Sequence, residues 1–466
     1  MDALAVPVAL ALLVYLVGML ALGVFVRERT ADVEGYVVAG RRLDLGLATP
    51  TLLATWFGAG TLLAATDAVR AEGLRAAALD PFGAGLCLVL AGLWLARPLW
   101  RMRLLTLPDF YARTYGTRAE VAAAVVMVPG YLGWIAAQLV ALSTVVELYL
   151  GLPHGLALPL VAVAGVAYTL VGGMWAVTLT DAVQMALVVV GVLVLGAVTL
   201  AELGDGGIVA GWTRLVAETP AAKARVLPEA GEVLPWLSLL AAGALGNLPG
   251  QDLTQRIFAA RSERVAQVAC LLAGGLYLAI GTVPLAIGLA ADLLLPEAVT
   301  EAILPALAHH LLHPAVAVVL VVTVISAVLS TLDSAILAPA SVIAHNLWGR
   351  GGGAEHVARY RWAVGGVAAA ALGLASLGQS AWDLLQTAYE ASLVGLLVPL
   401  LGGLWWPGRS ERAALAALGA GTGVWALHLA GGYDTLAGTP VPIGLAGLGC
   451  SALAFLVVGL RDGRQA

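Results

Sequence analysis

The chain has 466 residues, of which 61% are hydrophobic and only 11% are charged, compared with about 25% charged residues in an ordinary soluble domain. This composition argues against a soluble enzyme, and the lack of a basic stripe argues against a nucleic-acid-binding protein. The three cysteines lie inside apolar runs and form no CxxC pair, so neither a disulfide framework nor a cysteine metal site is expected. The expected surroundings of the chain are the hydrocarbon of a bilayer.

Thirteen apolar segments are long enough to cross a bilayer, which takes about 20 residues per helix. We expect spanning helices over residues 1–26, 43–66, 77–99, 119–149, 156–176, 181–201, 235–255, 265–291, 314–345, 360–379, 383–405, 411–430 and 440–460. An acid precedes the first segment and arginines follow it, which is the reverse of a cleaved signal peptide, so we expect it to be retained. No loop is long enough for a second folded domain, so the function is expected to reside in the helices.

The basic residues predict the orientation of these helices. With the N-terminus outside and the C-terminus inside, all but five of the 24 lysines and arginines fall on inner loops, and the five outer ones are Arg70, Arg75, Arg214, Lys223 and Arg225. Positive charge gathers on the cytoplasmic side of membrane proteins. We therefore expect a multi-pass protein of the plasma membrane, in a bacterium the inner membrane, with the lipid bilayer as its surroundings.

Two of the predicted helices carry helix breakers at their centres, at 58–60 and at 243–250. Mid-membrane breaks free backbone groups that a neighbour, an ion or a cavity must satisfy. The two broken helices run in opposite directions and each opens a block of five helices, which is typical of an inverted-repeat secondary transporter with its sites at the breaks. For either segment alone, close helix packing at small residues is the alternative.

The expected fold is thus an all-α, polytopic membrane protein. Its predicted parts are an N-terminal extra helix at 1–27, a first repeat at 43–201, an extracellular loop at 202–234, a second repeat at 235–405, and two C-terminal helices within 406–466.

Several motifs resemble those of the sodium:solute symporter family. They are YTLVGGMWAVTLTDAVQ at 168–184, ISAVLSTLDSAI at 325–336, EGYVVAGR at 34–41, LTLPDFY at 105–111, and Gln255-Arg256 at the end of the second broken segment. The resemblance implies a LeuT-like core of five plus five inverted helices, with one helix before it and two after. It also implies that sodium is the coupling ion for the uptake of a solute, without an organic cofactor.

Two consecutive hydroxyls, Ser330 and Thr331, lie in an otherwise apolar helix. Hydroxyl and carbonyl oxygens suit a hard monovalent cation, although such hydroxyls also commonly bond the carbonyls of their own helix. The resemblance implies that they bind sodium together with the backbone carbonyls of Ala54, Phe57 and Ala327.

The resemblance implies a second, linked ion site at Asp181, Asp333 and Ser334. A carboxylate at the centre of a spanning helix costs on the order of 3 kcal/mol and tends to be functional. Because Asp181 follows a predicted inner turn, a solvated helix N-cap is the alternative for this residue.

The segments 54–60 and 85–98 resemble those of the choline-transporter branch of the family. A quaternary ammonium is attracted to the faces of aromatic rings, and the resemblance places Trp56 and Trp134 on two positions of an aromatic box. Two further box positions fall on Ala84 and Gly250, so half of the box is expected to be missing.

Two acids lie close to these positions, Asp80 one turn before Ala84 and Asp252 two residues after Gly250. Either acid is a candidate counter-charge for the solute, or a site for a proton or sodium. The alternatives are an acid in water at the outer mouth for Asp80, and a pair with Arg256 at i+4 for Asp252. The predicted substrate site also includes Gly58, Gly250 and Gln138, and Gln138 either bonds the solute or bonds a neighbouring helix.

The expected function is therefore sodium-coupled import of a small organic solute, such as choline, betaine or an amino acid. A symporter for a sugar, a monocarboxylate or urea is one alternative, and a membrane sensor that acts through a separate partner is another. An enzyme is not expected, because His345 is the one histidine in a predicted core helix. His309 and His313 lack a third zinc ligand, so no metal site other than sodium is expected. The sequence does not indicate an oligomeric state.

Overall fold

The computed structural model describes residues 2–296, 303–304, 306–307, 314–351, 354–378 and 380–463, which are helical apart from turns, loops and two isolated bridges. The first half contains α1 (Asp2–Phe25), α2 (Val33–Val38), α3 (Leu45–Trp56), α4 (Ala65–Glu72), α5 (Ala84–Leu90), α6 (Ala96–Arg101), α7 (Leu107–Thr114), α8 (Thr117–Leu150), α9 (His154–Leu203), α10 (Ile208–Glu218) and α11 (Ala221–Ala224). The second half contains α12 (Val233–Ala241), α13 (Gln251–Ala259), α14 (Glu263–Leu294), α16 (Pro314–Val342), α17 (Ala354–Ala375), α18 (Ala381–Gly395), α19 (Leu397–Trp405), α20 (Glu411–Ala430) and α21 (Ile443–Gly463).

Ten helices among the described residues are long and apolar enough to cross a membrane, and eleven if the bent pair Leu45–Trp56 and Gly60–Glu72 forms one span. The protein is therefore an all-helical membrane protein. Two further predicted segments are helical but are not among these spans: α17, and the short apolar stretch His154–Ala167. The number of thirteen crossings and the orientation stay predictions.

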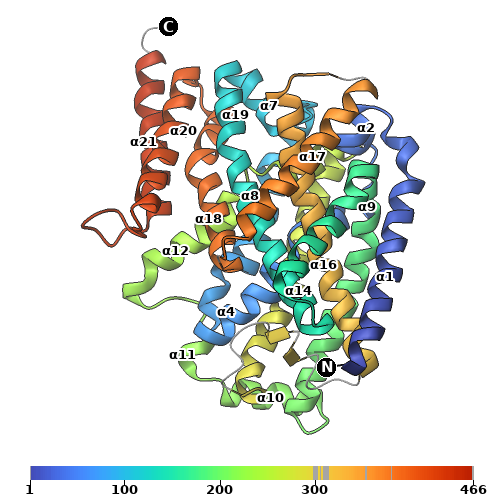
Figure 1. Ribbon diagram of the computed structural model, residues 1–466. Coiled ribbons are helices and arrows are strands. Elements are labelled where there is room, and N and C mark those ends of the chain that lie inside the picture. The colour runs from blue at the N-terminus through green and yellow to red at the C-terminus, as the bar shows by residue number, and fades with distance from the viewer. Residues whose placement is uncertain are drawn as a thin grey trace.

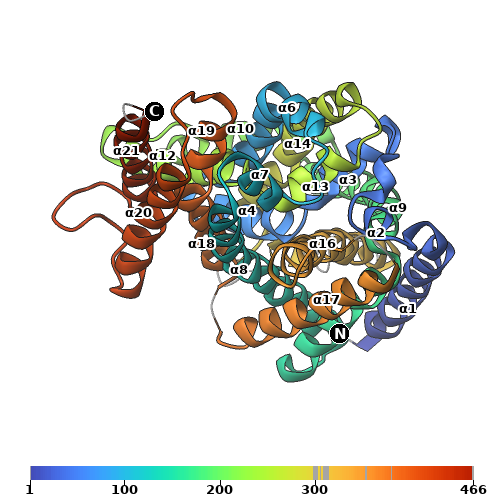
Figure 2. The same cartoon turned by 90° about the horizontal axis from the view of Figure 1, so that it is seen from above.

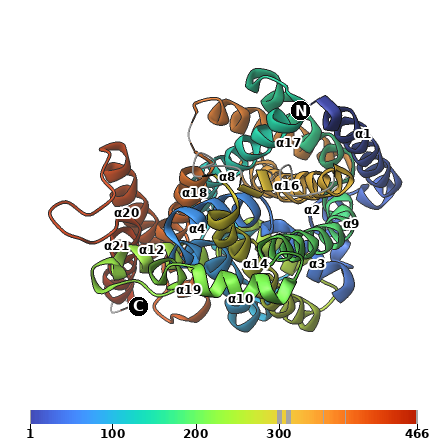
Figure 3. The same cartoon turned by 90° about the horizontal axis from the view of Figure 1, so that it is seen from below.

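The helices form one bundle, with the two chain ends at opposite ends of it (Figure 1). The amphipathic helix α10 lies at the same end as the N-terminus. In the end-on views α16 lies inside the bundle, whereas α1 and the α20–α21 pair lie at opposite edges (Figures 2 and 3). Almost the whole apolar stretch Val321–Leu347, which begins in α16, is buried. The predicted ion-binding helix is thus the one most enclosed by others.

The long helix α9 is broken at Gly173, which has φ +49° and ψ −146°. A Cβ at this position would lie 2.6 Å from the Tyr36 carbonyl oxygen, so a glycine is required there. The prediction of a turn directly before Asp181 is therefore wrong. Asp181 lies in the interior of the helical stretch after Gly173 and is fully buried, which also excludes the solvated N-cap.

Both predicted breaks interrupt their helices. The first helix pair bends by 55° between Trp56 and the π-helical turn η3 (Gly60–Ala64). In the second, a π-helical turn η8 (Ala242–Gly246) and a short non-helical stretch separate α12 from α13.

Candidate functional site

The first break exposes a backbone carbonyl to a neighbouring helix. Phe57 has φ −78° and ψ +63°, and the amide of Gly58 donates to the Trp56 carbonyl at 2.8 Å. In a continuous helix the same amide would donate to Ala54, four residues earlier. The hydroxyl of Thr331 on α16 instead donates to the Ala54 carbonyl oxygen, at 3.1 Å.

The structure thus brings Thr331 and Ala54, two of the predicted sodium ligands, together across two helices. Ser330 donates to the Ala327 carbonyl of its own helix at 2.7 Å, which is the bonding that isolated helix hydroxyls commonly show. These four residues and Phe57 are all buried. A rotation of either hydroxyl would turn its hydrogen away from the carbonyl, so that the hydroxyl and carbonyl oxygens could both face a cation. The geometry is therefore compatible with an ion site made of neutral oxygens.

Gly58 allows the close approach of α16 to this break. A Cβ on Gly58 would lie 2.2 Å from Thr331 Oγ1. On the other side, Gln138 of α8 accepts a hydrogen bond from the free amide of Ala59 at 3.1 Å. In this structure Gln138 therefore bonds the neighbouring helix, the second of its two interpretations.

A buried arginine lies among the residues of the predicted second ion site. Arg256 Nη2 donates to Ser334 Oγ at 2.5 Å and lies 3.6 Å from Asp181 Oδ2. Thr51 Oγ1 donates to the same carboxylate oxygen at 2.5 Å, and Ser334 in turn donates to Asp333 at 3.1 Å. The guanidinium, 1% exposed, therefore supplies positive charge where a second ion was expected.

The expected pair between Arg256 and the carboxylate of Asp252 is not formed. Arg256 Nη1 donates to the backbone carbonyl of Asp252 at 3.0 Å. The carboxylate of Asp252 accepts instead from Trp56 Nε1, at 2.5 Å, and from the hydroxyl of Tyr131. The prediction of an i+4 pair is wrong because α13 points its arginine into the helix bundle, toward α3, α9 and α16.

Asp252 lies at a cavity lined by aromatic side chains. The ring centroid of Trp134 is 5.8 Å from that of Tyr131 and 6.5 Å from that of Tyr389. The cavity measures about 20 Å³, space for a single water molecule. Its lining is Gly130, Tyr131, Trp134, Gly246, Asn247, Gly250, Asp252, Ala388, Tyr389 and Ser392.

The aromatic lining is therefore more complete than expected. Although Ala84 and Gly250 are not aromatic, Tyr131 and Tyr389 border the cavity. Tyr131 precedes Trp134 by about one turn of α8, and this spacing was a signal that sequence reasoning missed. Tyr389 belongs to α18, whose packing against α8 is a tertiary contact without a sequence signal.

Asp80 is buried, at 1% exposure, in the π-helical turn η5 (Leu79–Gly83). Its Oδ1 accepts from Thr61 Oγ1 and from the hydroxyl of Tyr277 on α14, both at 2.9 Å. The alternative of an acid in water at the outer mouth is therefore wrong.

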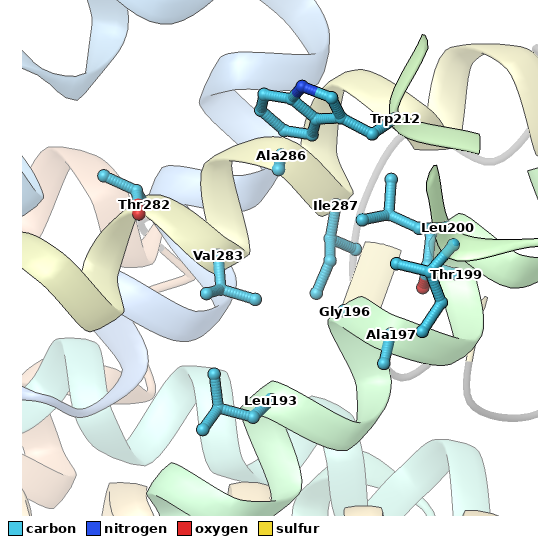
Figure 4. Close-up of a pocket in the computed structure, with 11 residues that line it drawn as sticks. Leu193, Gly196, Ala197, Thr199, Leu200, Trp212, Thr282, Val283, Ala286 and Ile287 are labelled. Carbon is cyan, nitrogen blue, oxygen red and sulfur yellow. The ribbon is translucent and has the colours of Figure 1, made fainter. Parts of the chain in front are cut away.

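A larger, apolar pocket lies between α9, α10 and α14, with Trp212 at one side (Figure 4). Its volume is about 320 Å³, and apart from two threonines its lining is apolar. None of the predicted ion or substrate residues lines it. It offers no counter-charge and is not the candidate solute site.

At the end of the bundle opposite to α10, the motif residue Asp109 of α7 forms an ionic cluster. Asp109 lies 3.3 Å from His345 and 3.4 Å from Arg350, and Arg350 also pairs with Glu120 at 2.9 Å. Burial alone would raise the pKa of Asp109, but His345, the Thr106 amide and Arg350 outweigh it and hold this pKa below its usual range.

Among the described residues, no group of three or more His, Cys, Asp or Glu side chains is placed to hold a metal ion. His309 and His313 lie outside the described residues.

The chain is similar in sequence to known choline transporters. The high affinity choline transporter 1 of Homo sapiens is 28% identical over 364 residues, which cover 73% of this chain and 61% of the relative. That of Torpedo marmorata is 30% identical over 331 residues, which cover 68% and 56%. The chain therefore spans about three fifths of the length of these relatives.

Two solved structures share the fold. A substrate-bound, outward-open Na⁺-coupled sialic acid symporter superposes with a TM-score of 0.82, at 16% identity and with 97% of each chain covered. A nucleobase-cation-symport-1 family transporter, closed with bromovinylhydantoin bound, gives a TM-score of 0.61 at 13% identity, with 92% of this chain and 95% of the other covered. At these identities the likeness establishes the LeuT-like transporter fold alone.

The profile of the "Sodium:solute symporter family" matches residues 36–420, which is most of the chain. The matched region contains both helix breaks, the hydroxyls of α16 and the aromatic cavity. The chain belongs to the sodium:solute symporter family.

Proposed function

We propose that the protein is a sodium-coupled symporter that imports a small cationic or zwitterionic organic solute by alternating access. The proposal rests on the observation that the last turn of α3 contributes a residue to each of two candidate sites. The carbonyl of Ala54 faces the hydroxyl of Thr331, and Trp56, two residues later, bonds the Asp252 carboxylate at the aromatic cavity. A cation held at the first site would therefore stabilise the position of Trp56, the residue that bonds the acid of the second site.

The proposed sodium ligands are the carbonyls of Ala54, Phe57 and Ala327 and the hydroxyls of Ser330 and Thr331. We further propose that Asp181, Asp333 and Ser334 form a second cation site. In this structure the guanidinium of Arg256 occupies the place of the cation. A second sodium would then bind only when the guanidinium moves away.

The proposed solute class follows from the chemistry around Asp252. A carboxylate bordered by Trp56, Tyr131, Trp134 and Tyr389 combines a counter-charge with ring faces, and both attract an organic cation. Choline, betaine and an amino acid carry such a charge, and the similarity to choline transporters supports this class. Gly58, Gln138, Gly250 and Asp80 complete the proposed substrate region.

The aromatic cavity must open before it can hold such a solute. In the closed cavity Asp252 is bonded to Trp56 and Tyr131. We propose that an arriving ammonium group replaces these two donors at the carboxylate. This exchange would couple solute binding to movement of the second broken helix against α3 and α8.

The test is uptake into proteoliposomes under an inward sodium gradient, with choline, betaine, proline, sugars, monocarboxylates and urea as solutes. We expect choline or betaine to accumulate only with the sodium gradient, and Asp252→Asn to reduce accumulation at least tenfold. The exposed Asp383→Asn is the control and should leave it unchanged. Equal uptake under a potassium gradient would contradict sodium coupling, sugar uptake would contradict the solute class, and binding without accumulation would favour a sensor.

A further inference from the structure

The second buried acid at the first broken helix, Asp80, has surroundings that differ from those of Asp252. Its Oδ1 belongs to a cluster of four oxygens with Thr61 Oγ1, the Tyr277 hydroxyl and the Trp56 carbonyl. Three segments of the chain meet at this cluster, namely the first broken helix, η5 and α14. None of the oxygens belongs to the proposed sodium site.

The cluster contains more oxygen contacts than hydroxyl hydrogens. Tyr277 contacts the Trp56 carbonyl and Asp80, each at 2.9 Å, and Thr61 contacts Asp80 at 2.9 Å, the Trp56 carbonyl at 3.5 Å, and Tyr277. The two hydroxyls supply only two hydrogens to these contacts. If Asp80 is ionised and accepts both hydrogens, Thr61 and Tyr277 face each other, and both face the Trp56 carbonyl, without a hydrogen between them.

A proton on Asp80 Oδ1 raises the number of hydrogens to three, which is enough to link the four oxygens in one continuous series of hydrogen bonds. Asp80 then donates to Thr61, Thr61 donates to Tyr277, and Tyr277 donates to the Trp56 carbonyl. Each hydrogen is used once, and the series ends on a group that can only accept.

The other carboxyl oxygen, Asp80 Oδ2, also favours a neutral acid. It is buried without a hydrogen-bond partner and points toward Gly60, where a Cβ would lie 2.7 Å from it. A buried carboxylate oxygen without a donor is far more costly than a buried neutral carbonyl oxygen. If Asp80 is protonated at Oδ1, the unpartnered Oδ2 is a neutral carbonyl oxygen and the larger cost is avoided.

The titratable groups that face this cluster are themselves neutral or acidic. Two tyrosines, Tyr277 on α14 and Tyr389 on α18, interact electrostatically with Asp80. Tyr389 also interacts with Asp252 on α13 and with Cys87 on α5. Among the described residues, Asp80 forms no ion pair with a basic side chain.

The spacing of the oxygens favours a proton over a metal cation. A hard cation such as calcium holds its oxygen ligands at about 2.3–2.6 Å, which separates neighbouring ligands by more than about 3 Å. The contacts of 2.9 Å around Tyr277 are those of hydrogen bonds.

We propose that Asp80 is a proton-binding site, which holds a proton while the cavity is closed and releases it to water when the helices open. The Tyr277 hydroxyl contacts both Asp80 and the Trp56 carbonyl, so it connects this proton to the residue that bonds Asp252. The inference rests on the proposed function in one respect: a cationic solute that enters the opened cavity would then compete with the proton for the negative charge of Asp80.

Infrared difference spectroscopy on the purified protein tests this proposal without solute or ion gradient, so the result does not depend on the uptake assay. In potassium buffer near neutral pH, the difference between wild type and Asp80→Asn should contain the C=O band of a protonated carboxylic acid, which shifts in D₂O. The difference for the exposed Asp383→Asn should contain carboxylate bands alone. A carboxylate band lost on Asp80→Asn would overturn the proposal.

Two further measurements guard against misfolding and against a metal ion. Tyr277→Phe keeps the ring but removes the hydroxyl, so it should shift the acid band of Asp80, and an unmoved band would contradict the assignment. In sodium buffer the acid band should persist. Its replacement by a carboxylate band in sodium would show that the cluster binds sodium in place of a proton, and would likewise overturn the proposal.

Discussion

Two buried acids contact the two halves of the first broken helix, and the protein surrounds them differently. Asp181 accepts from Thr51 before the break and lies 3.6 Å from the guanidinium of Arg256. Asp80 contacts Thr61 after the break, and its other partner is a neutral tyrosine hydroxyl. A buried charge is tolerated when an opposite charge accompanies it, and otherwise the group takes up or loses a proton. An aspartate therefore has a cation beside it on one side of the break and, as we infer, is a neutral acid without a cation on the other.

The largest expected effect in this comparison comes from removing the arginine. Arg256→Gln leaves Asp181 as a buried charge without its cation, which costs about 3–5 kcal/mol. Thermal unfolding in detergent should show this loss, whereas the exposed Arg214→Gln should change stability by less than about 0.5 kcal/mol.

The double variant of Arg256→Gln with Asp181→Asn should recover part of the loss, because it removes both charges. If the second ion site is correct, sodium should also stabilise Arg256→Gln more than it stabilises wild type. If Arg256→Gln were as stable as wild type, Asp181 would not depend on the arginine, and its environment would not differ from that of Asp80 in the way we infer.

The neutral oxygens at the break give the next largest effect. Sodium should stabilise wild type more than potassium does, by about 2.7 kcal/mol at a concentration one hundred times the dissociation constant. Ser330→Ala combined with Thr331→Ala should abolish the difference between the two salts. Ser341→Ala is a matched control, since Ser341 bonds the Leu337 carbonyl of the same helix at 2.7 Å. Equal unfolding temperatures in both salts would rule out the sodium site.

A third acid, Asp109, extends the comparison to a paired carboxylate outside the spanning helices. Because its pKa in the folded protein lies below the usual value, the pair stabilises the protein above about pH 4. This contribution should disappear as the pH falls through the lowered pKa. Asp109→Asn removes the charged partner of His345 and Arg350, so it should cost about 1–2 kcal/mol at neutral pH and should flatten the acid side of the stability profile. A profile as steep as that of wild type would refute this role.

The smallest expected effect is that of Asp80→Asn. If Asp80 is already neutral, an amide of the same shape should change the unfolding free energy by no more than about 1 kcal/mol. Asp181→Asn should cost more, because it leaves the Arg256 guanidinium buried without its carboxylate. Equal losses in thermal unfolding for the two variants would contradict a neutral Asp80 beside a paired Asp181.

Part of the candidate site could be predicted because it depends on local order along the chain. Glycines at 58–60 mark the first break, and the hydroxyls of Ser330 and Thr331 stand out in an apolar helix. Arg256 was harder to interpret, because an arginine after a spanning segment usually faces an inner loop. Its true partners belong to α3, α9 and α16, and no local pattern connects them with α13.

Composition and motifs were sufficient to predict the membrane class, the family, the two breaks and the residues of the proposed ion sites. These properties follow from composition and from motifs in which the chemistry is contained in a few neighbouring residues. Which acid has a cation beside it depends on the packing of the helices, since Asp80, Asp181 and Asp252 differ in the neighbours that other helices bring to them. A carboxyl group in a bilayer is charged or neutral according to the groups that it contacts. These partners can be more than a hundred residues away in the sequence, as Tyr131 is from Asp252 and Tyr277 is from Asp80.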